Sequence, residues 1–224
     1  MIFKVASVDS LIIYFGNEIN EKIALDVKRA YHCLMGLNID GLIEIIPSYT
    51  SIYISYDIFK YEYLSLVELL KKNINLEYEK SFKENIVTID VYYAEEVGLD
   101  LSYMSDKTNL SISEIIDIHS SKLYDVYAIG FLPGFAYLAS VDEKIALPRL
   151  STPRKKIPKG SVAIANTQTA VYPQSSPGGW NIIGRTAIEL FDKSLEKLSP
   201  LSVGDKVKFN PISKEDFLLQ GGII

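Results

Sequence analysis

Cations gather in a proline-rich stretch of a chain that is acidic overall. Residues 149–159 hold five lysines and arginines, whereas the whole chain of 224 residues has a formal net charge of −5. Proline fixes the backbone dihedral φ, so these charges do not lie on a floppy tail. The planar fork of arginine matches carboxylates and phosphates. We expect Arg149 and Arg154 to hold such an anion, or to pair with a carboxylate of the chain, and the lysines to be solvated.

Two runs rich in glycine and proline present aromatic side chains. Residues 130–138 read Gly-Phe-Leu-Pro-Gly-Phe-Ala-Tyr-Leu, and residues 172–180 read Tyr-Pro-Gln-Ser-Ser-Pro-Gly-Gly-Trp. The aromatics either fill the core or line a pocket, and the sequence leaves both open. Glycine also lets backbone N–H groups approach a ligand closely. The candidate ligand-binding residues are Phe131, Pro133, Phe135, Gln168, Tyr172, Ser176, Pro177, Gly178, Gly179 and Trp180.

Two further residues are candidates for the chemistry itself. His119 ends a predicted short helix, where a histidine is either a hydrogen-bonded structural residue or a general base near neutral pH. Arg185 follows the second glycine-rich run and adds another cation. The two histidines and one cysteine form no readable zinc cluster, so no metal site is predicted. The sequence also contains neither a common phosphate-binding loop nor a nucleophile-elbow motif.

The first 80 residues are predicted to form a small α+β domain that positions none of these candidates. Helical spacing of apolar residues predicts one helix capped by Asn20 and a second over 61–72. The order β-β-α-β-β-α indicates two helices on one face of an antiparallel sheet. A polar stretch over 73–85 is a predicted linker. Strands of this domain are predicted at 2–6, 11–15, 42–46 and 52–56.

A second domain, over 86–224, must position the candidate residues. Ser111 and Glu114 form a predicted capping box that opens the helix ending at His119. Beyond Tyr124, short apolar runs alternate with glycine and proline turns, which is typical of a closed or sandwich-like β domain. Strands are predicted at 86–93, 126–130, 161–165, 169–172, 182–183, 187–191 and 206–209.

Bulk composition restricts the partners. The net charge of −5 and a pI near 5.2 argue against nonspecific nucleic-acid binding. No apolar stretch approaches the roughly 20 residues of a membrane span, and the chain begins with a strand-like pattern rather than a leader. The single cysteine, Cys33, is expected to be a small buried residue in a reducing compartment. We therefore expect a cytoplasmic protein.

Taken together, the segments resemble one known family. His119 is followed by the two aromatic runs, by Pro-Arg-Leu-Ser-Thr-Pro-Arg at 148–154 and by Ile-Ile-Gly-Arg-Thr at 182–186. This succession is similar to the family that comprises the B subunit of 5-oxoprolinase (PxpB), KipI and allophanate hydrolase subunit 1. Upstream, the family pattern Tyr-Gly-x-Glu-x-Gly-Pro-Asp-Leu reads Tyr-Ala-Glu-Glu-Val-Gly-Leu-Asp-Leu at 93–101.

The resemblance implies a fold and an activity. It implies a ferredoxin-like α+β domain at the N-terminus, followed by a cyclophilin-like β-barrel. It also implies a protein that is inactive alone and acts with the C and A subunits in the ATP-dependent opening of 5-oxoproline to L-glutamate, at an ATP site shared with a partner. Arg149, Arg154 and Arg185 would then neutralise charge that develops on a phosphorylated intermediate.

The same resemblance leaves other functions open. A KipI-like protein would bind and inhibit a sensor histidine kinase, and Phe131, Phe135 and Trp180 would then form a protein-binding groove. A carboxyltransferase-like subunit of urea or allophanate metabolism is the third alternative. Prolyl isomerisation would depend on fold analogy alone, which is poor support for a function.

Overall fold

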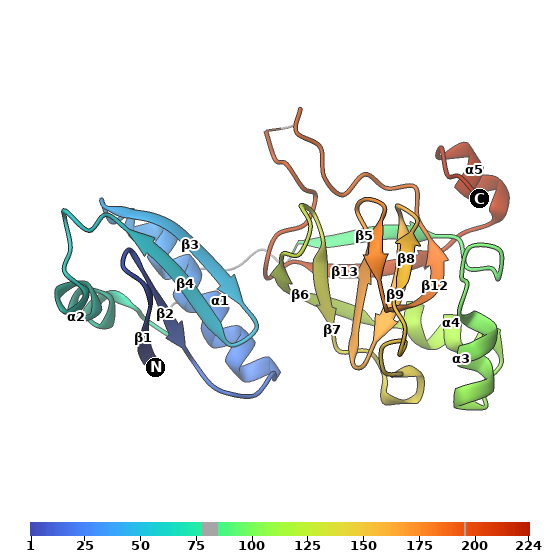
Figure 1. Ribbon diagram of the computed structural model, residues 1–224, viewed down its shortest axis with the longest axis horizontal. Helices are drawn as coiled ribbons and strands as arrows, with labels where there is room; N and C mark the ends of the chain where they lie inside the picture. Colours follow the sequence, from blue (N-terminus) through green and yellow to red (C-terminus); the bar gives the residue numbers. More distant parts are fainter. Residues whose placement is uncertain (78–84, 195) are drawn as a thin grey trace. The chain divides into compact units, whose positions relative to one another are not determined.

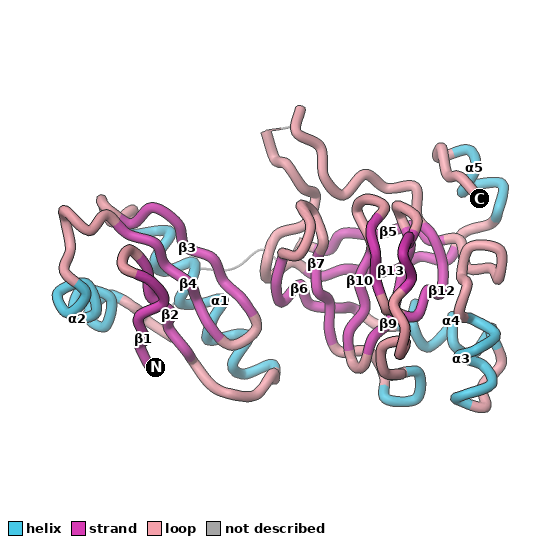
Figure 2. The backbone as a smooth tube through the Cα atoms, viewed as in Figure 1, coloured by secondary structure: helices cyan, strands magenta, loops and turns pink. Residues whose placement is uncertain are grey.

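The chain divides into two compact units, Met1–Lys83 and Glu84–Ile224 (Figures 1 and 2). The structure is a computed structural model that describes residues 1–77, 85–194 and 196–224. The predicted domain end at residue 80 and the middle of the predicted linker lie outside the described residues. Within those three ranges, no helix is both long and apolar enough to cross a membrane. The α+β class predicted from the sequence is confirmed.

The N-terminal unit is a four-stranded antiparallel sheet with two helices. Its strands lie in the order β1-β2-β4-β3. The predicted succession of strands and helices is confirmed, with boundaries that differ by one or two residues. The elements are β1 (Ile2–Ser7), β2 (Ser10–Tyr14), α1 (Glu21–Leu37), β3 (Leu42–Ser48), β4 (Ser51–Tyr56) and α2 (Tyr63–Asn73).

Helix α1 forms where the sequence predicts it. The side chain of Asn20 accepts a hydrogen bond from the backbone N–H of Ile23 at 2.9 Å and caps the helix. Val27, Ala30 and Leu34 recur at helical spacing and are buried. They share one core with apolar side chains of α2 and of the central strands β2 and β4, so both helices cover the same face of the sheet.

The C-terminal unit is a seven-stranded sheet that nearly closes into a barrel, in the order β12-β9-β10-β7-β6-β13-β5. Strands β13 and β5 pair in parallel. A bridge joins the two outer edges: Tyr92 and Arg185 exchange backbone hydrogen bonds of 2.8 and 2.9 Å. The elements are β5 (Ile86–Val91), α3 (Leu101–Thr108), α4 (Ile112–Ser121), β6 (Leu123–Ile129), β7 (Ala136–Ala139), β8 (Arg154–Ile157), β9 (Ser161–Ala165), β10 (Gln168–Val171), β11 (Ser176–Gly178), β12 (Asn181–Arg185), β13 (Lys206–Pro211) and α5 (Lys214–Leu219).

Strand β9 separates two apolar clusters, because successive side chains point to opposite faces. Val162 and Ile164 join the main core, which also takes side chains from α3 and α4. Ala163 points the other way, into a second cluster with Ile182 and several aromatic rings. The two-stranded sheet of β8 and β11 contributes Ile157 to this second cluster. The candidate ligand-binding residues gather on that side of the barrel.

Two local predictions are confirmed in detail. The Ser111 hydroxyl accepts a hydrogen bond from the Glu114 N–H at 3.2 Å, and the Glu114 carboxylate accepts one from the Ser111 N–H at 2.8 Å. This capping box opens α4, which carries His119 near its end. Cys33 is buried, and its thiol donates to the carbonyl of Asn73 at 3.2 Å. It therefore packs as a small core residue.

Other local predictions are wrong. Residues 187–191 form no strand; Leu190 is buried in the main core from a loop, so the apolar run there reflects packing rather than pairing. Helix α5 was not predicted, because six residues are too few to display a 3.6-residue period. Strands β8 and β11 were not predicted either, since they are short and rich in charge or proline.

Candidate functional site

Five aromatic side chains form one contiguous group, here called the aromatic cluster: Phe131, Phe135, Tyr137, Tyr172 and Trp180. Phe135 is its centre, with ring centroids 4.9 to 5.8 Å from those of the other four. Edge-to-face contacts of this kind stabilise aromatic groups beyond the burial of their area. Phe135 is 1% exposed, whereas Phe131 is 62% exposed. Of the two alternatives left open by the sequence, Phe135 therefore fills the core, whereas Phe131 lies at the surface and its role in a ligand pocket stays a prediction.

The turn that carries Phe131 is fixed by its backbone. Phe131 itself has a φ of 72°, in the left-handed region that a bulky residue adopts rarely. Gly134 has a φ of 81°, and a Cβ atom there would collide with the carbonyl oxygen of Leu190. The exposed Pro133 lies between them. This geometry holds the Phe131 ring at the rim of the aromatic cluster.

Arg149 adds a positive charge to the aromatic cluster. Its guanidinium carbon lies 5.7 Å from the ring centroid of Trp180, within the range of a cation–π interaction. Arg149 is exposed and Trp180 is 4% exposed, so the cation faces solvent over a buried ring. Burial raises the pKa of Tyr172 to about 12, and the charge of Arg149 opposes that shift. The phenol is therefore neutral and able to donate a hydrogen bond at neutral pH.

The remaining residues of the second glycine-rich run support this surface. Ser176 and Gly178 pair with β8, so part of the run is engaged in a two-stranded sheet. A Cβ atom on Gly178 would collide with the hydroxyl of Tyr172 and with Ile157, which explains the glycine. Pro177 is exposed, Gly179 is half-buried, and Gln168 is half-buried at the start of β10.

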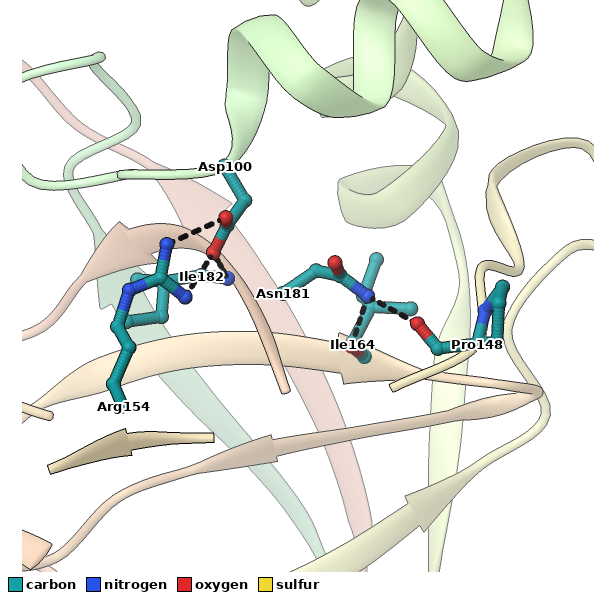
Figure 3. A network of polar contacts seen from close by, with 6 residues as sticks. All are labelled: Asp100, Pro148, Arg154, Ile164, Asn181 and Ile182. Atoms are coloured by element: carbon teal, nitrogen blue, oxygen red, sulfur yellow. Dashed lines mark hydrogen bonds and ion pairs between the residues drawn. The ribbon is translucent and has the colours of Figure 1, made fainter. Parts of the chain in front are cut away.

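Asn181 fixes the loop that bears Arg149 (Figure 3). Its side-chain amide donates to the carbonyl of Pro148 at 3.0 Å and to that of Ile164 at 3.2 Å. The backbone N–H of Leu150 also donates to the carbonyl of Gly179 at 2.7 Å. Asn181 is fully buried, and its side-chain oxygen Oδ1 has no hydrogen-bond partner among the described residues. The loop is therefore held against β12 from both sides of Arg149.

Replacing Asn181 with leucine should lower the free energy of unfolding by about 2 kcal/mol, because the carbonyl groups of Pro148 and Ile164 lose their donor and the second of these bonds is buried. It should also release the Arg149 loop, so that acrylamide quenches the fluorescence of Trp180, the only tryptophan, more strongly. The exposed Asn210, changed to leucine, is the matched control and should leave quenching unchanged. Equal quenching in the wild-type chain and the Asn181→Leu variant would show that Asn181 does not fix the loop.

Arg154 is engaged in a different network (Figure 3). Its Nη1 and Nη2 atoms donate to the carboxylate of Asp100 at 2.9 and 2.7 Å. The same carboxylate accepts the backbone N–H of Ile182 at 2.7 Å, and the Asp100 N–H donates to the Ile182 carbonyl at 2.9 Å. The side chain of Asp100 is 5% exposed and that of Arg154 is 29% exposed. This is the carboxylate pairing that the sequence left open for Arg154.

His119 lies in the barrel interior with no exposed surface. The Thr169 hydroxyl donates to the Ala163 carbonyl at 3.1 Å, so it accepts from His119 Nε2 at 2.9 Å. His119 Nδ1 then accepts from the Tyr93 hydroxyl at 2.8 Å. Burial lowers the pKa of His119 to about 3. Both ring nitrogens are occupied in the neutral form, which favours the structural alternative over a general base.

The four residues predicted to take part in catalysis therefore have different interaction partners. Arg149 lies over Trp180, Arg154 pairs with Asp100, and His119 is enclosed by the core. The guanidinium of Arg185 donates to the backbone carbonyl of Ile223 at 2.7 Å. The described residues contain no group of three side chains that could hold a metal ion. Of the four, Arg149 is the exposed cation that joins the aromatic cluster.

Sequence reasoning missed three polar residues that the fold makes important: Asp100, Ser161 and Asn181. Asp100 lies in the segment 93–101 that resembles a family motif, which was a usable signal. Asn181 directly follows Trp180, but nothing in its local sequence indicates burial. Ser161 begins an otherwise apolar strand, and a serine there does not attract notice.

The class of this protein follows from its match to a known family. Residues 1–201 match the family described as "Carboxyltransferase domain, subdomain C and D". The chain is also 40% identical to the B subunit of 5-oxoprolinase from Bacillus subtilis (strain 168) over 219 residues, which covers 93% of this chain and 91% of that protein. The chain belongs to the family of 5-oxoprolinase B subunits.

Solved structures agree with this assignment. TTHA0988 superposes with a TM-score of 0.82 at 32% identity and covers 91% of this chain, which spans 40% of the length of TTHA0988. Protein PH0987 from Pyrococcus horikoshii is 40% identical, with a TM-score of 0.59, and the match covers 96% of this chain and 100% of that one. Members of this fold family therefore occur both at this length and within longer chains.

Proposed function

We propose that this chain is the B subunit of an ATP-dependent 5-oxoprolinase, which acts with the C and A subunits to open 5-oxoproline to L-glutamate and is inactive alone. The observation that carries the proposal is the 40% identity to the Bacillus subtilis protein over 93% of the chain. The buried Cys33 suits a reducing compartment, and we extend the proposal to the cytoplasm.

The cationic aromatic surface supports this function. The lactam ring of 5-oxoproline is nearly flat and its carboxylate is negative at neutral pH. A flat ring can pack against Phe131 or Trp180, while Arg149 attracts the negative charge of a carboxylate or phosphate. Because Arg149 is exposed, its charge is also available to a nucleotide held at a contact with a partner protein. Arg154 and His119 then support the site through packing rather than through contact with the substrate.

We also propose the finer fold assignment. The sheet order β1-β2-β4-β3 is that of a ferredoxin-like sheet, with one difference in connectivity. The strand that comes last along a ferredoxin-like chain comes first in this one. The nearly closed sheet over residues 86–224, with its edges bridged by Tyr92 and Arg185, supports a cyclophilin-like barrel. The N-terminal domain would then comprise residues 1–80.

A KipI-like inhibitor of a histidine kinase remains the second candidate. The observation in its favour is Phe131, a large apolar side chain that is 62% exposed beside an exposed arginine. Aromatic residues and arginine dominate the energetic centres of protein interfaces. The carboxyltransferase name of the matching family likewise keeps a role in urea or allophanate metabolism open.

The deciding experiment measures 5-oxoproline-dependent release of ADP by this chain alone and after mixing with its A and C partners. We expect release only from the mixture. Replacing Arg149 with methionine should then reduce turnover by about 10- to 100-fold, as expected for a lost charge-assisted hydrogen bond, while the exposed residue leaves stability unchanged. The neighbouring Lys155→Met variant removes the same charge and should retain turnover within about twofold.

No ADP release from a complex that is shown to form would overturn the oxoprolinase proposal. Inhibition of kinase autophosphorylation by the same chain, lost in a Phe131→Ala variant, would then favour the KipI-like function.

A further inference from the structure

Arg185 is a buried cation that forms no ion pair with any described residue. Arg185 is 8% exposed, and none of the described carboxylates lies within 4.0 Å of its guanidinium. Nη1 donates to the Ile223 carbonyl at 2.7 Å, whereas Nε is buried and has no partner among the described residues. Burial lowers the pKa of Arg185, which means that the buried site disfavours the charged form of the guanidinium. Holding such a charge costs several kcal/mol unless an anion joins it.

A second unpaired donor lies beside it. Ser161 and Arg185 face each other across strands β9 and β12. Directly opposed residues of an antiparallel pair point to the same face of the sheet, so both side chains are on one side. Ser161 is fully buried, and its hydroxyl has no partner in the part of the chain that is described. The backbone N–H of Tyr172, a member of the aromatic cluster, donates to the Ser161 carbonyl at 2.9 Å, so this residue neighbours the proposed donor.

The segment that covers Arg185 is residues 220–224, here called the C-terminal strap. It follows α5, whose Phe217 is fully buried and stacks on Tyr92 at a centroid distance of 5.6 Å. Gly221 has a φ of 87°, and a Cβ atom there would meet nothing within 4 Å. The strap therefore leaves the docked helix through a glycine in open space and places a backbone carbonyl on the guanidinium.

We propose that Arg185 and Ser161 form the binding site for the carboxylate of a small substrate, and that the C-terminal strap closes this site when it is empty. The Ile223 carbonyl accepts from Nη1 at 2.7 Å, the distance of a charge-assisted hydrogen bond, and this bond holds the strap on the guanidinium while Nε and Nη2 are left for the ligand. A carboxylate adds the missing negative charge and accepts from Nε, Nη2 and the serine hydroxyl. The identity of the ligand as 5-oxoproline rests on the proposed function; the carboxylate site does not.

The test uses the Nε–H resonances of the full-length chain, which has four arginines. The signal that disappears in an Arg185→Lys variant identifies Arg185. Titration with 5-oxoproline should shift this signal in a saturable way, whereas 2-pyrrolidinone, the same ring without the carboxylate, should leave it in place. Arg185→Lys keeps the charge but lacks Nε, and we expect its affinity to fall at least tenfold. Ser161→Ala should weaken binding about fivefold, as expected for one hydrogen bond.

Two further variants examine the strap and provide the control. Removal of Ile223 and Ile224 should tighten 5-oxoproline binding severalfold, because the strap is no longer held on the guanidinium. Arg29→Met, in the N-terminal unit, removes an arginine elsewhere and should leave the affinity unchanged. An Arg185 signal that ignores 5-oxoproline in both the full-length and the shortened chain would overturn the proposal, as would an equal response to 2-pyrrolidinone.

The outcome is separable from that of the proposed function. A carboxylate response without ADP release from the assembled subunits would preserve this site and reject the oxoprolinase. ADP release together with an Arg185 signal that 5-oxoproline does not shift would support the oxoprolinase and reject this carboxylate site.

Discussion

Replacing Arg154 with methionine is expected to lower the free energy of unfolding by about 3 kcal/mol, the low end of the range for breaking a buried ion pair, because Arg154 is partly exposed. The loss arises mainly from Asp100, whose side chain is 5% exposed and whose buried negative charge loses its cation. The hydrogen bond from the N–H of Ile182 then offsets part of the cost of burying that charge. Urea denaturation monitored by far-UV circular dichroism measures the change.

A double-mutant cycle separates the ion pair from other effects. Asp100→Asn together with Arg154→Met removes both charges, and the double variant should be more stable than the sum of the single losses predicts. Lys159→Met breaks the exposed pair with Glu189 and is the matched control, with a much smaller shift in the denaturation midpoint. Additive losses in the cycle would mean that Arg154 and Asp100 stabilise the fold independently.

The free energy of unfolding should fall by about 2 kcal/mol between pH 7 and pH 5 because of His119 alone. Burial lowers its pKa from 6.5 to about 3 in the folded chain. Between these two values the unfolded chain binds a proton that the folded chain does not. The stability contribution is therefore complete above pH 6.5 and is lost progressively as the pH falls toward 3.

The measurement is urea denaturation at pH 7, 6 and 5 for the wild-type chain and a His119→Gln variant. Other groups titrate in both proteins, so the difference between their pH profiles isolates His119. We expect the variant to be less stable at pH 7 and to lose less stability on acidification. Parallel profiles would show that the imidazole has the same pKa in the folded and the unfolded chain, which would favour the general-base role.

The N-terminal unit could be predicted from the sequence because its signals are local. The Asn20 cap and the spacing of Val27, Ala30 and Leu34 belong to one helix, and two of the three strand pairs, β1–β2 and β3–β4, join consecutive strands. The barrel depends on pairing between distant segments, which no local pattern reports. Strand β8 is short and charged, and β9 and β10 separate it in the chain from its partner β11, so no local pattern links the two.

The sequence was enough to predict which residue types make up the candidate site, but not which of these residues contact one another. The sequence does not distinguish Arg149, Arg154 and Arg185. The fold shows that the first lies over a tryptophan, the second pairs with an aspartate, and the third forms no ion pair with the described residues. Asp100 precedes Arg154 by 54 residues, so no spacing rule links them. The sequence also singled out the two aromatic runs, whose rings pack together in the fold, but their role in ligand binding stays a prediction.

The pairing of β5 with β13 also determines when this protein can fold during synthesis. Asp90 and Asn210 face each other across the two strands although they are 120 residues apart. A ribosome therefore releases β5 long before its partner exists, and loop closure of that length delays the final step. The N-terminal unit is complete before any strand of the barrel has been made. The nascent chain accordingly carries a folded first unit and an open barrel, with unpaired β5, until β13 has emerged.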